Sequence, residues 1–127
     1  MDVGRATMHL NLYASLLYGA TLLLAPEQFC DLLQAEPVNL AWLRTIGAAL
    51  LGTNVLGSWL WLRSPSLDVA RIQFATALLE AVAMLTSLLL GEFTAERLYL
   101  VQGSVFLAFL VSAGLWPTLQ VEADPQA

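Results

Sequence analysis

Four long apolar stretches, separated by short polar breaks, dominate the pattern along the 127-residue chain. They cover residues 8–25, 40–62, 69–90 and 95–119. Each is close to the ~20 residues that a helix needs to cross a hydrocarbon core about 30 Å thick. Because the breaks are short, consecutive helices are expected to lie antiparallel. The pattern therefore predicts one all-α domain, a four-helix transmembrane bundle in up-down-up-down order.

Prolines mark the ends of three of these stretches. The first stops at Pro26, the second is followed by Pro65, and Pro117 lies near the end of the fourth. Since proline lacks a backbone N–H, it ends helices more often than it continues them. We therefore predict that residues 120–127, which are mostly polar, form a tail beyond the last helix.

The connection at residues 26–39 is longer than the others and has a helical pattern of its own. Its two faces carry Phe29, Leu32 and Leu33 on one side and Glu27, Asp31 and Gln34 on the other. This pattern predicts a short amphipathic helix at the membrane interface. Because its polar face is anionic, we expect it to pack on the end of the bundle or on a partner rather than on lipid headgroups.

Composition supports a membrane setting and excludes several kinds of protein. Hydrophobic residues make up 58% of the chain and charged residues 12%, which is more apolar than a soluble core of this size can bury. The net charge is −5 and the chain has no lysine, so nucleic acid is not expected as a partner. With one cysteine, Cys30, the chain cannot form an internal disulfide or use a thiol–disulfide mechanism.

The arginines indicate an orientation. With four spans, both termini lie on one side of the membrane. That side holds Arg5, Arg63 and Arg71, and the other holds Arg44 and Arg97. The positive-inside rule then favours cytoplasmic termini.

Glu80 is the exception within the third apolar stretch, where it lies in the sequence TALLEAVAML. A charged side chain at mid-bilayer costs on the order of 2.5–3.5 kcal/mol on insertion scales, so this carboxyl must be protonated, paired or hydrated. Steps of three and four place it on one helical face, formed by Gln73, Thr76, Glu80, Ala83 and Ser87. We predict that this face points into the bundle.

Polar stripes on the neighbouring helices could meet this face. They consist of Asn11, Ser15 and Tyr18 on the first helix, and of Gly47, Leu51, Asn54 and Ser58 on the second. Two interpretations of Glu80 stay open. In one, it hydrogen-bonds Asn54, Tyr18 or a backbone carbonyl and joins the helices. In the other, it carries a proton or binds a ligand in a membrane pocket.

The candidate ligand-binding or proton-carrying residues are Glu80, Asn54, Tyr18, Gln73 and His9. A metal ion or haem is not expected, because no recognisable set of further ligands accompanies His9. We expect no other cofactor and identify no catalytic residues. A second group of candidates are small residues that let helices approach closely, namely Gly47, Gly52, Gly57, Ser104, Ala108 and Ser112.

The segments LYGATLLLAPEQFCDLL and LRTIGAALLGTNVLG resemble the layout of small DoxX-like four-helix membrane proteins. This resemblance implies the fold and a bacterial inner-membrane setting, and it brings no catalytic residue. The segment NVLGSW is similar to a motif of dual-topology fluoride channels, but EAVAMLTSLLLGEF lacks their third-helix motif. Small multidrug transporters are also four-helix proteins of about this length with a glutamate in the membrane. Their glutamate is on the first helix, whereas Glu80 is on the third, so the two do not correspond in position.

These patterns favour a non-enzymatic integral membrane protein, either an accessory or assembly component of a membrane complex or a homo-oligomer. The lipid bilayer and a membrane-protein partner are the expected surroundings. The alternative is a binder or transporter of a hydrophobic small molecule, such as a quinone, a lipid or an amphipathic cation, through a pocket around Glu80. An enzyme ranks third, because Glu80 and His9 are far apart in the sequence.

Overall fold

The computed structural model describes residues 2–36 and 39–123, together with the side chains up to residue 120. These residues form six α-helices and one π-helical segment, and they contain no β-strand. The elements are α1 (Val3–Leu24), α2 (Pro26–Leu33), α3 (Leu40–Leu50), η1 (Leu51–Val55), α4 (Leu56–Arg63), α5 (Leu67–Leu89) and α6 (Leu98–Ala123). The all-α class predicted from the sequence is confirmed.

Three helical rods in the described residues are long and apolar enough to cross a membrane on their own. They are Leu40–Arg63, in which α3, η1 and α4 follow one another without a break, Leu67–Leu89, and Leu98–Gln120. The first helix qualifies only together with α2, to which it is bent by 111°. Polar side chains on α1, such as Asn11 and Ser15, account for its lower hydropathy. The protein is therefore an integral membrane protein with three to four candidate spans.

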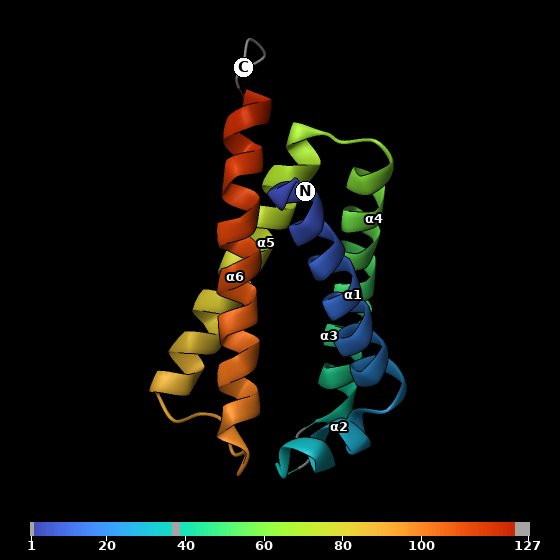
Figure 1. Ribbon diagram of the computed structural model, residues 1–127. Helices are drawn as coiled ribbons and strands as arrows, with labels where there is room; N and C mark the ends of the chain where they lie inside the picture. The colour runs from blue at the N-terminus through green and yellow to red at the C-terminus, as the bar shows by residue number, and fades with distance from the viewer. Residues whose placement is uncertain (1, 37–38, 124–127) are drawn as a thin grey trace.

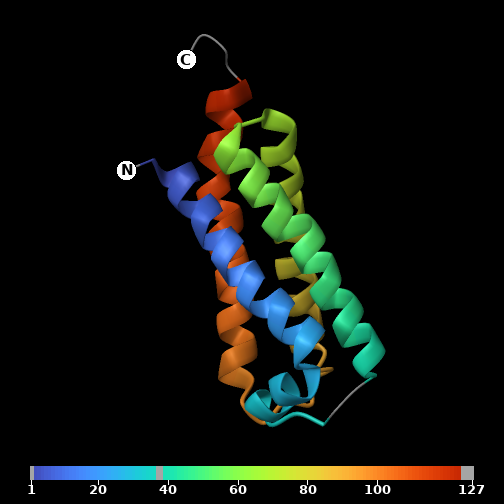
Figure 2. The ribbon, with the colours of Figure 1, turned by 90° about the vertical axis from the view of Figure 1, so that its right-hand side faces the viewer.

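The helices lie side by side but do not stay together along their whole length (Figure 1, Figure 2). The start of α1, the end of α6 and the α4–α5 connection share one end of the bundle, which we call the terminal end. The opposite end, which we call the α2 end, holds α2 and the α5–α6 connection. Helix α1 packs against α3, η1, α4 and α6.

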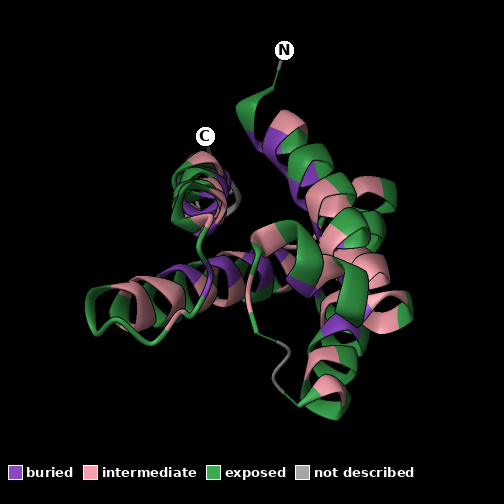
Figure 3. Cartoon of the chain, turned by 90° about the horizontal axis from the view of Figure 1, so that it is seen from below, coloured by how far each residue is buried: buried purple, intermediate pink, exposed green. Residues whose placement is uncertain are grey.

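Helix α5 diverges from α3 toward the α2 end. It packs closely on α6 and also contacts α4 and η1, but it has no comparable contact with α3. Figure 3, seen from the α2 end, shows α5 leaning away from the pair formed by α1 and α3. The apolar core lies toward the terminal end, where Met8, Trp61, Ala70, Ala77, Val111 and Leu115 pack together. The two halves of the bundle therefore differ in how tightly they are closed.

Local sequence signals explain several helix ends. The Asp2 carboxylate accepts the Gly4 backbone N–H at 2.9 Å and caps α1, and the Asn39 side chain accepts from Ala41 in the same way at the start of α3. Pro26 occupies the first turn of α2, where its missing N–H removes no helical hydrogen bond. The break between α1 and α2 follows from this proline.

Arginines satisfy free carbonyl groups at three helix ends. The last turn of a helix leaves carbonyl oxygens without an intrahelical donor, and a basic side chain can supply one. The pairs are Arg5 to the Leu62 carbonyl at 3.1 Å, Arg44 to Leu23 at 2.6 Å and Arg97 to Leu32 at 2.9 Å. Each guanidinium therefore links two elements at an end of the bundle.

Several helix boundaries differ from the sequence-based expectation, most of all those of the first and last helices. Helix α1 begins at Val3 rather than at residue 8, because Asp2 supplies an N-cap. Helix α6 begins at Leu98 and continues through Pro117 to Ala123, so residues 120–123 of the expected tail are helical. A proline within a membrane helix is tolerated when the freed carbonyl is satisfied by its surroundings. The remaining tail residues, 124–127, lie outside the described part of the chain.

The short helix α2 is present, but its buried face differs from the expected one. Pro26 and Cys30 are buried, and the Phe29 ring packs edge-on against Tyr18 with 6.2 Å between centroids. Leu32, expected on the same face as Phe29, is 55% exposed. Because α2 folds back sharply at its proline, the residues at Pro26, Phe29 and Cys30, three and four apart, face the bundle.

Candidate functional site

A buried polar network joins four helical elements in the middle of the bundle. The Nδ2 group of Asn11 donates to Ser58 Oγ and to Gln73 Oε1, each at 2.9 Å. Ser15 donates to Asn11 Oδ1 at 3.4 Å, and Gln73 Nε2 donates to the Thr53 carbonyl at 3.1 Å. Gln73 is 1% exposed, so its side-chain amide is buried from both water and lipid. The network links α1, α4, α5 and η1 through hydrogen bonds that a bilayer cannot replace.

The π-helical turn η1 provides one acceptor of this network. Here the Leu56 N–H bonds to the Leu51 carbonyl, five residues earlier instead of four. Such a turn holds one additional residue and leaves a carbonyl without its usual helical donor. The Thr53 carbonyl accepts the Leu56 N–H within the turn and also the Gln73 amide from α5. Gln73 therefore binds the backbone of the widened turn next to Asn54.

Asn54 connects the same turn to Glu80. Its Nδ2 lies 3.1 Å from Glu80 Oε1 and 3.3 Å from Oε2. Asn54 is 2% exposed, whereas Glu80 is half-buried. Among the described residues, Asn54 is the one group that donates a hydrogen bond to this carboxyl. The carboxyl group therefore has acceptor positions left over.

A pocket lies directly beside this pair, where α5 begins to diverge from α3. Its volume is about 230 Å³ and it is open to the outside of the bundle. The lining residues are Ile46, Ala49, Leu50, Thr53, Asn54, Thr76 and Glu80. The α3 side of the lining is apolar, and the polar groups gather at η1 and α5. An amphipathic lining of this kind suits a molecule with one polar end.

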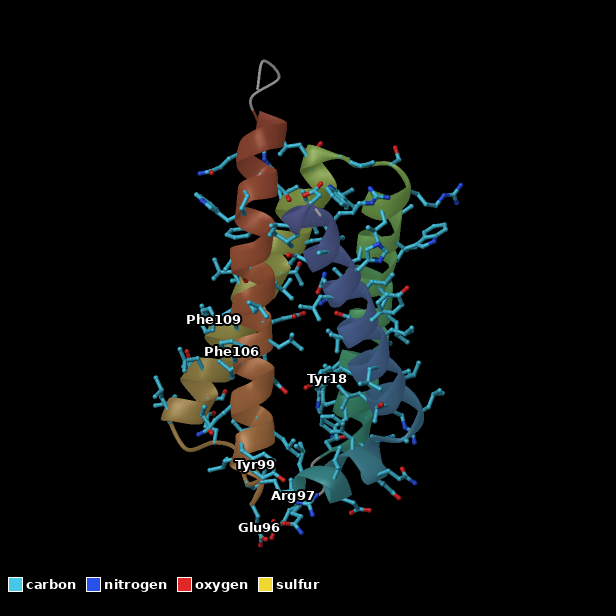
Figure 4. The ribbon with its side chains drawn as sticks, in the orientation of Figure 1. Tyr18, Glu96, Arg97, Tyr99, Phe106 and Phe109 are labelled. Atoms are coloured by element: carbon cyan, nitrogen blue, oxygen red, sulfur yellow. The ribbon has the colours of Figure 1, made fainter. Side chains whose placement is uncertain are left out.

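Tyr18 does not reach Glu80. Its hydroxyl lies 2.6 Å from Ser104 Oγ on α6 (Figure 4). Because Ser104 donates its own proton to the Leu100 carbonyl at 3.0 Å, Tyr18 is the donor in this pair. The expected role of Tyr18 beside Glu80 is therefore replaced by a link between α1 and α6. The polar residues expected to form one stripe on α1 therefore have different partners. Asn11 hydrogen-bonds residues of α4 and α5, and Tyr18 hydrogen-bonds a residue of α6.

His9 also lies away from the pocket. It is exposed on α1 and stacks on Tyr13, with ring centroids 6.1 Å apart and planes 11° apart. Within residues 2–36 and 39–123, no group of three His, Cys, Asp or Glu side chains is arranged to hold a metal ion. The pocket therefore consists of a carboxyl, an amide, two hydroxyls and apolar side chains.

The face of α5 that points into the bundle carries polar side chains where α5 lies against η1. Gln73 and Glu80 face η1, and Thr76 between them lines the pocket. Ala83, expected on the same inward face, is exposed. This difference follows from the divergence of α5, which leaves its later turns packed on α6 but not on α3.

The glycines of the second span fall into two groups. A Cβ on Gly47 would lie 2.7 Å from the Gly19 carbonyl oxygen of α1, and one on Gly57 would meet Gln73 Nε2. Both positions therefore need glycine for close contact. A Cβ on Gly52 would meet no atom within 4 Å, and the same holds for Gly103 on α6. At these two positions the described residues leave open space for a side chain.

The small residues of α6 have separate roles. Ser104 receives Tyr18, and buried Ser112 donates to the Ala108 carbonyl at 3.0 Å within the same helix. Gly114 was not singled out from the sequence, yet a Cβ there would meet the Thr7 side chain of α1. Gly19 was also missed. No local pattern separates these glycines from the others, because the need for glycine comes from the opposite helix.

Comparison of the chain with protein-family models, with curated proteins and with solved structures finds no match. The resemblance to DoxX-like proteins therefore has no matching family model behind it, and no family is identified for this chain. What the protein does has to be argued from the arrangement of its own residues.

Proposed function

We propose that this integral membrane protein binds a small amphipathic molecule that reaches it from the bilayer. The observation that carries the proposal is the pocket of about 230 Å³ in which the Glu80 carboxyl forms the polar end. Asn54 donates to the carboxyl from one side, and no other side chain in the described residues donates to it, which leaves acceptor positions of Glu80 for a ligand. Ionisable groups inside membrane spans mark binding or transport pathways by default.

The surroundings of Glu80 favour binding over a purely structural role. A structural hydrogen bond between helices needs no space beside it, and the Gln73 network is an example, since Gln73 is 1% exposed. Glu80 instead lines an open pocket in the middle of α5. The apolar side of the lining, formed by Ile46, Ala49 and Leu50, would hold the hydrocarbon part of the ligand. Asn54 then acts as the residue that positions the carboxyl.

Native mass spectrometry from lipid nanodiscs tests this proposal. We would compare the wild type with Glu80→Gln, which keeps the size of the side chain and an oxygen acceptor for Asn54. Glu92→Gln is the matched control, because Glu92 is exposed outside the spans. A retained small-molecule mass should be present in the wild type and in Glu92→Gln and absent from Glu80→Gln. Equal retention in all three, or no retained molecule in the wild type, would refute the proposal.

A second candidate function is that of an accessory or assembly component that packs against another membrane helix or a second copy. Gly52 and Gly103 favour it, because both are exposed within candidate spans and a Cβ at either position would meet no atom of the described residues within 4 Å. Bare glycine faces let helices approach closely in a bilayer. Gly103→Leu should then abolish co-purification of a partner or shift the oligomeric state. A wild type that is a monomer in detergent and co-purifies with no other protein would exclude this function.

The orientation that accompanies both functions has the termini in the cytoplasm. Arg5, Arg63 and Arg71 belong to the terminal end, and Arg44 and Arg97 to the α2 end. The α2 end also carries the exposed acidic residues Glu27, Asp31, Glu36, Glu92 and Glu96. The excess of arginine at the terminal end supports the cytoplasmic assignment. Cysteine accessibility on intact cells, tested at exposed Ser64 and Glu36, would check it.

A further inference from the structure

The charge balance around the pocket narrows the chemistry of its ligand. We infer that the pocket beside Glu80 selects a molecule with a protonated amine head and an apolar body, in preference to neutral or anionic amphipaths. This inference rests on the proposed binding function and adds the ligand class.

No cationic side chain within the described residues compensates Glu80. All five arginines lie at the ends of the spans and are engaged there. Arg5, Arg44 and Arg97 bind backbone carbonyls, Arg63 lies over the Trp59 ring at 4.9 Å, and Arg71 pairs with Asp68 at 3.7 Å. His9 is exposed and stacks on Tyr13. The one donor to the Glu80 carboxyl in the described residues is the neutral amide of Asn54.

An ammonium group supplies what this carboxyl lacks. Hydrogen bonds between charged partners are about twice as strong as those between neutral ones. The cost of removing the carboxyl from water has already been met when the protein folds, so a bound cation gains attraction without that part of the penalty. The hydroxyls of Thr53 and Thr76, which also line the pocket, can accept further N–H groups of the same head.

The same lining disfavours amphipathic molecules with anionic or neutral polar groups. A phosphate or carboxylate would face Glu80, and the lining contains no arginine, lysine or histidine to offset the repulsion. A quinone presents carbonyl oxygens, which are acceptors, so it could bind only the O–H of a protonated Glu80 and would bring no charge to the carboxyl. A neutral alcohol can donate one hydrogen bond but brings no charge.

The volume and the position of the pocket limit the shape of the ligand. About 230 Å³ is below the 300–1,000 Å³ of typical sites for drug-sized ligands, so the pocket holds a compact head and a few carbons. Because the pocket is open to the outside of the bundle, the rest of an alkyl or aromatic body can remain among the lipid chains. A primary, secondary or tertiary amine fits better than a bulky quaternary head, because it also keeps an N–H for Glu80.

Equilibrium dialysis of three probes with the same dodecyl chain tests the inference. Dodecylamine, dodecanol and laurate carry a cationic, a neutral and an anionic head at neutral pH. Binding is measured as the difference between nanodiscs with the protein and empty nanodiscs of the same zwitterionic lipid, which removes simple partitioning. The variants are Glu80→Gln and Ala49→Phe, and the latter fills the apolar side of the pocket at an exposed position without changing a charge.

The expected result is that the wild type binds dodecylamine at least about tenfold more tightly than dodecanol and does not bind laurate. Glu80→Gln should lose this preference, and Ala49→Phe should weaken dodecylamine and dodecanol alike. Equal binding of dodecanol and dodecylamine by the wild type, or tighter binding of laurate, would overturn the ligand class and leave the binding function standing. No specific binding of any probe by the wild type would overturn both. The comparison of the three probes on the wild type tests the ligand class even if Glu80→Gln does not fold.

Discussion

One amide nitrogen of Asn54, in the π-helical turn of the second span, faces both carboxyl oxygens of Glu80 on the third, at 3.1 and 3.3 Å. The contact joins α5 to η1, whereas α5 has no comparable contact with α3. The pair thus hydrogen-bonds two candidate spans to each other and also lines the pocket. It therefore connects the stability of the fold with the candidate site.

A double-mutant cycle measures what this pair contributes to stability. Asn54→Leu and Glu80→Leu, singly and together, should show a coupling energy of about 0.6 kcal/mol and at most about 1.7 kcal/mol, the range found for hydrogen bonds between membrane helices. The measurement is reversible unfolding in mixed detergent micelles. A coupling energy of zero would mean that the contact contributes nothing to folding.

Substitution of Gln73 should lower the free energy of unfolding more than substitution of an exposed glutamine. Gln73→Leu leaves the Thr53 carbonyl without its side-chain donor and the Asn11 amide without one of its acceptors. A loss of about 1–3 kcal/mol in the free energy of unfolding is expected for buried polar groups left unpaired. Gln102→Leu is the control, because Gln102 is exposed on α6. Similar losses in both variants would contradict a special role of the network.

Two glycines of the same span should respond oppositely to the same substitution. Gly47→Ala places a Cβ 2.7 Å from the Gly19 carbonyl oxygen and forces α1 and α3 apart, so about 1–3 kcal/mol should be lost. Gly52→Ala meets nothing within 4 Å, and a gain of up to about 1 kcal/mol is expected from helix propensity. Thermal unfolding of the two variants in one detergent gives the comparison, and equal shifts would contradict the helix contact.

The attachment of α2 depends on residues just before α6. The Arg97 side chain donates to the Leu32 carbonyl at 2.9 Å, and the backbone N–H groups of Glu96 and Arg97 donate to Gln34 and Leu33 at 3.2 Å each. Arg97→Ala should therefore speed hydrogen exchange of amides in residues 26–34 severalfold while α5 stays protected.

Arg71→Ala is the matched control for this experiment. Arg71 is exposed and pairs with Asp68, which is more exposed still, so the contact contributes little to stability. Its loss should leave exchange in α2 unchanged. If Arg97→Ala gave the same pattern as Arg71→Ala, the attachment of α2 would depend on its apolar contacts at Pro26, Phe29 and Cys30 instead.

Much of the fold follows from local pattern. The long apolar stretches that become Leu40–Arg63, Leu67–Leu89 and Leu98–Gln120 are visible in the sequence, because hydropathy and segment length are properties of neighbouring residues. The helical period places Gln73 and Glu80 on one face, and the cost of a carboxyl in the bilayer turns that face toward a polar partner.

Other features depend on the opposite helix and have no local signal. Tyr18 pairs with Ser104 instead of Glu80, and His9 stacks on Tyr13 away from the pocket. Position 47 needs glycine because the Gly19 backbone of α1 lies against it, whereas position 52 has open space for a Cβ among the described residues. In each case the period indicates a face of the helix, but rotation and crossing of two helices decide which side chains meet.

Hydropathy, helical period and the cost of placing a charge in lipid are readable from the chain alone. They are enough to predict an all-α membrane protein, its candidate spans and a mid-span carboxyl that must find a polar partner. Three other features became visible in the packed helices: Asn54 is that partner, it lies in a π-helical turn whose backbone binds Gln73, and a pocket lies between α3 and α5 beside it. They could not be predicted because a helix widens or leans in response to the helices packed against it.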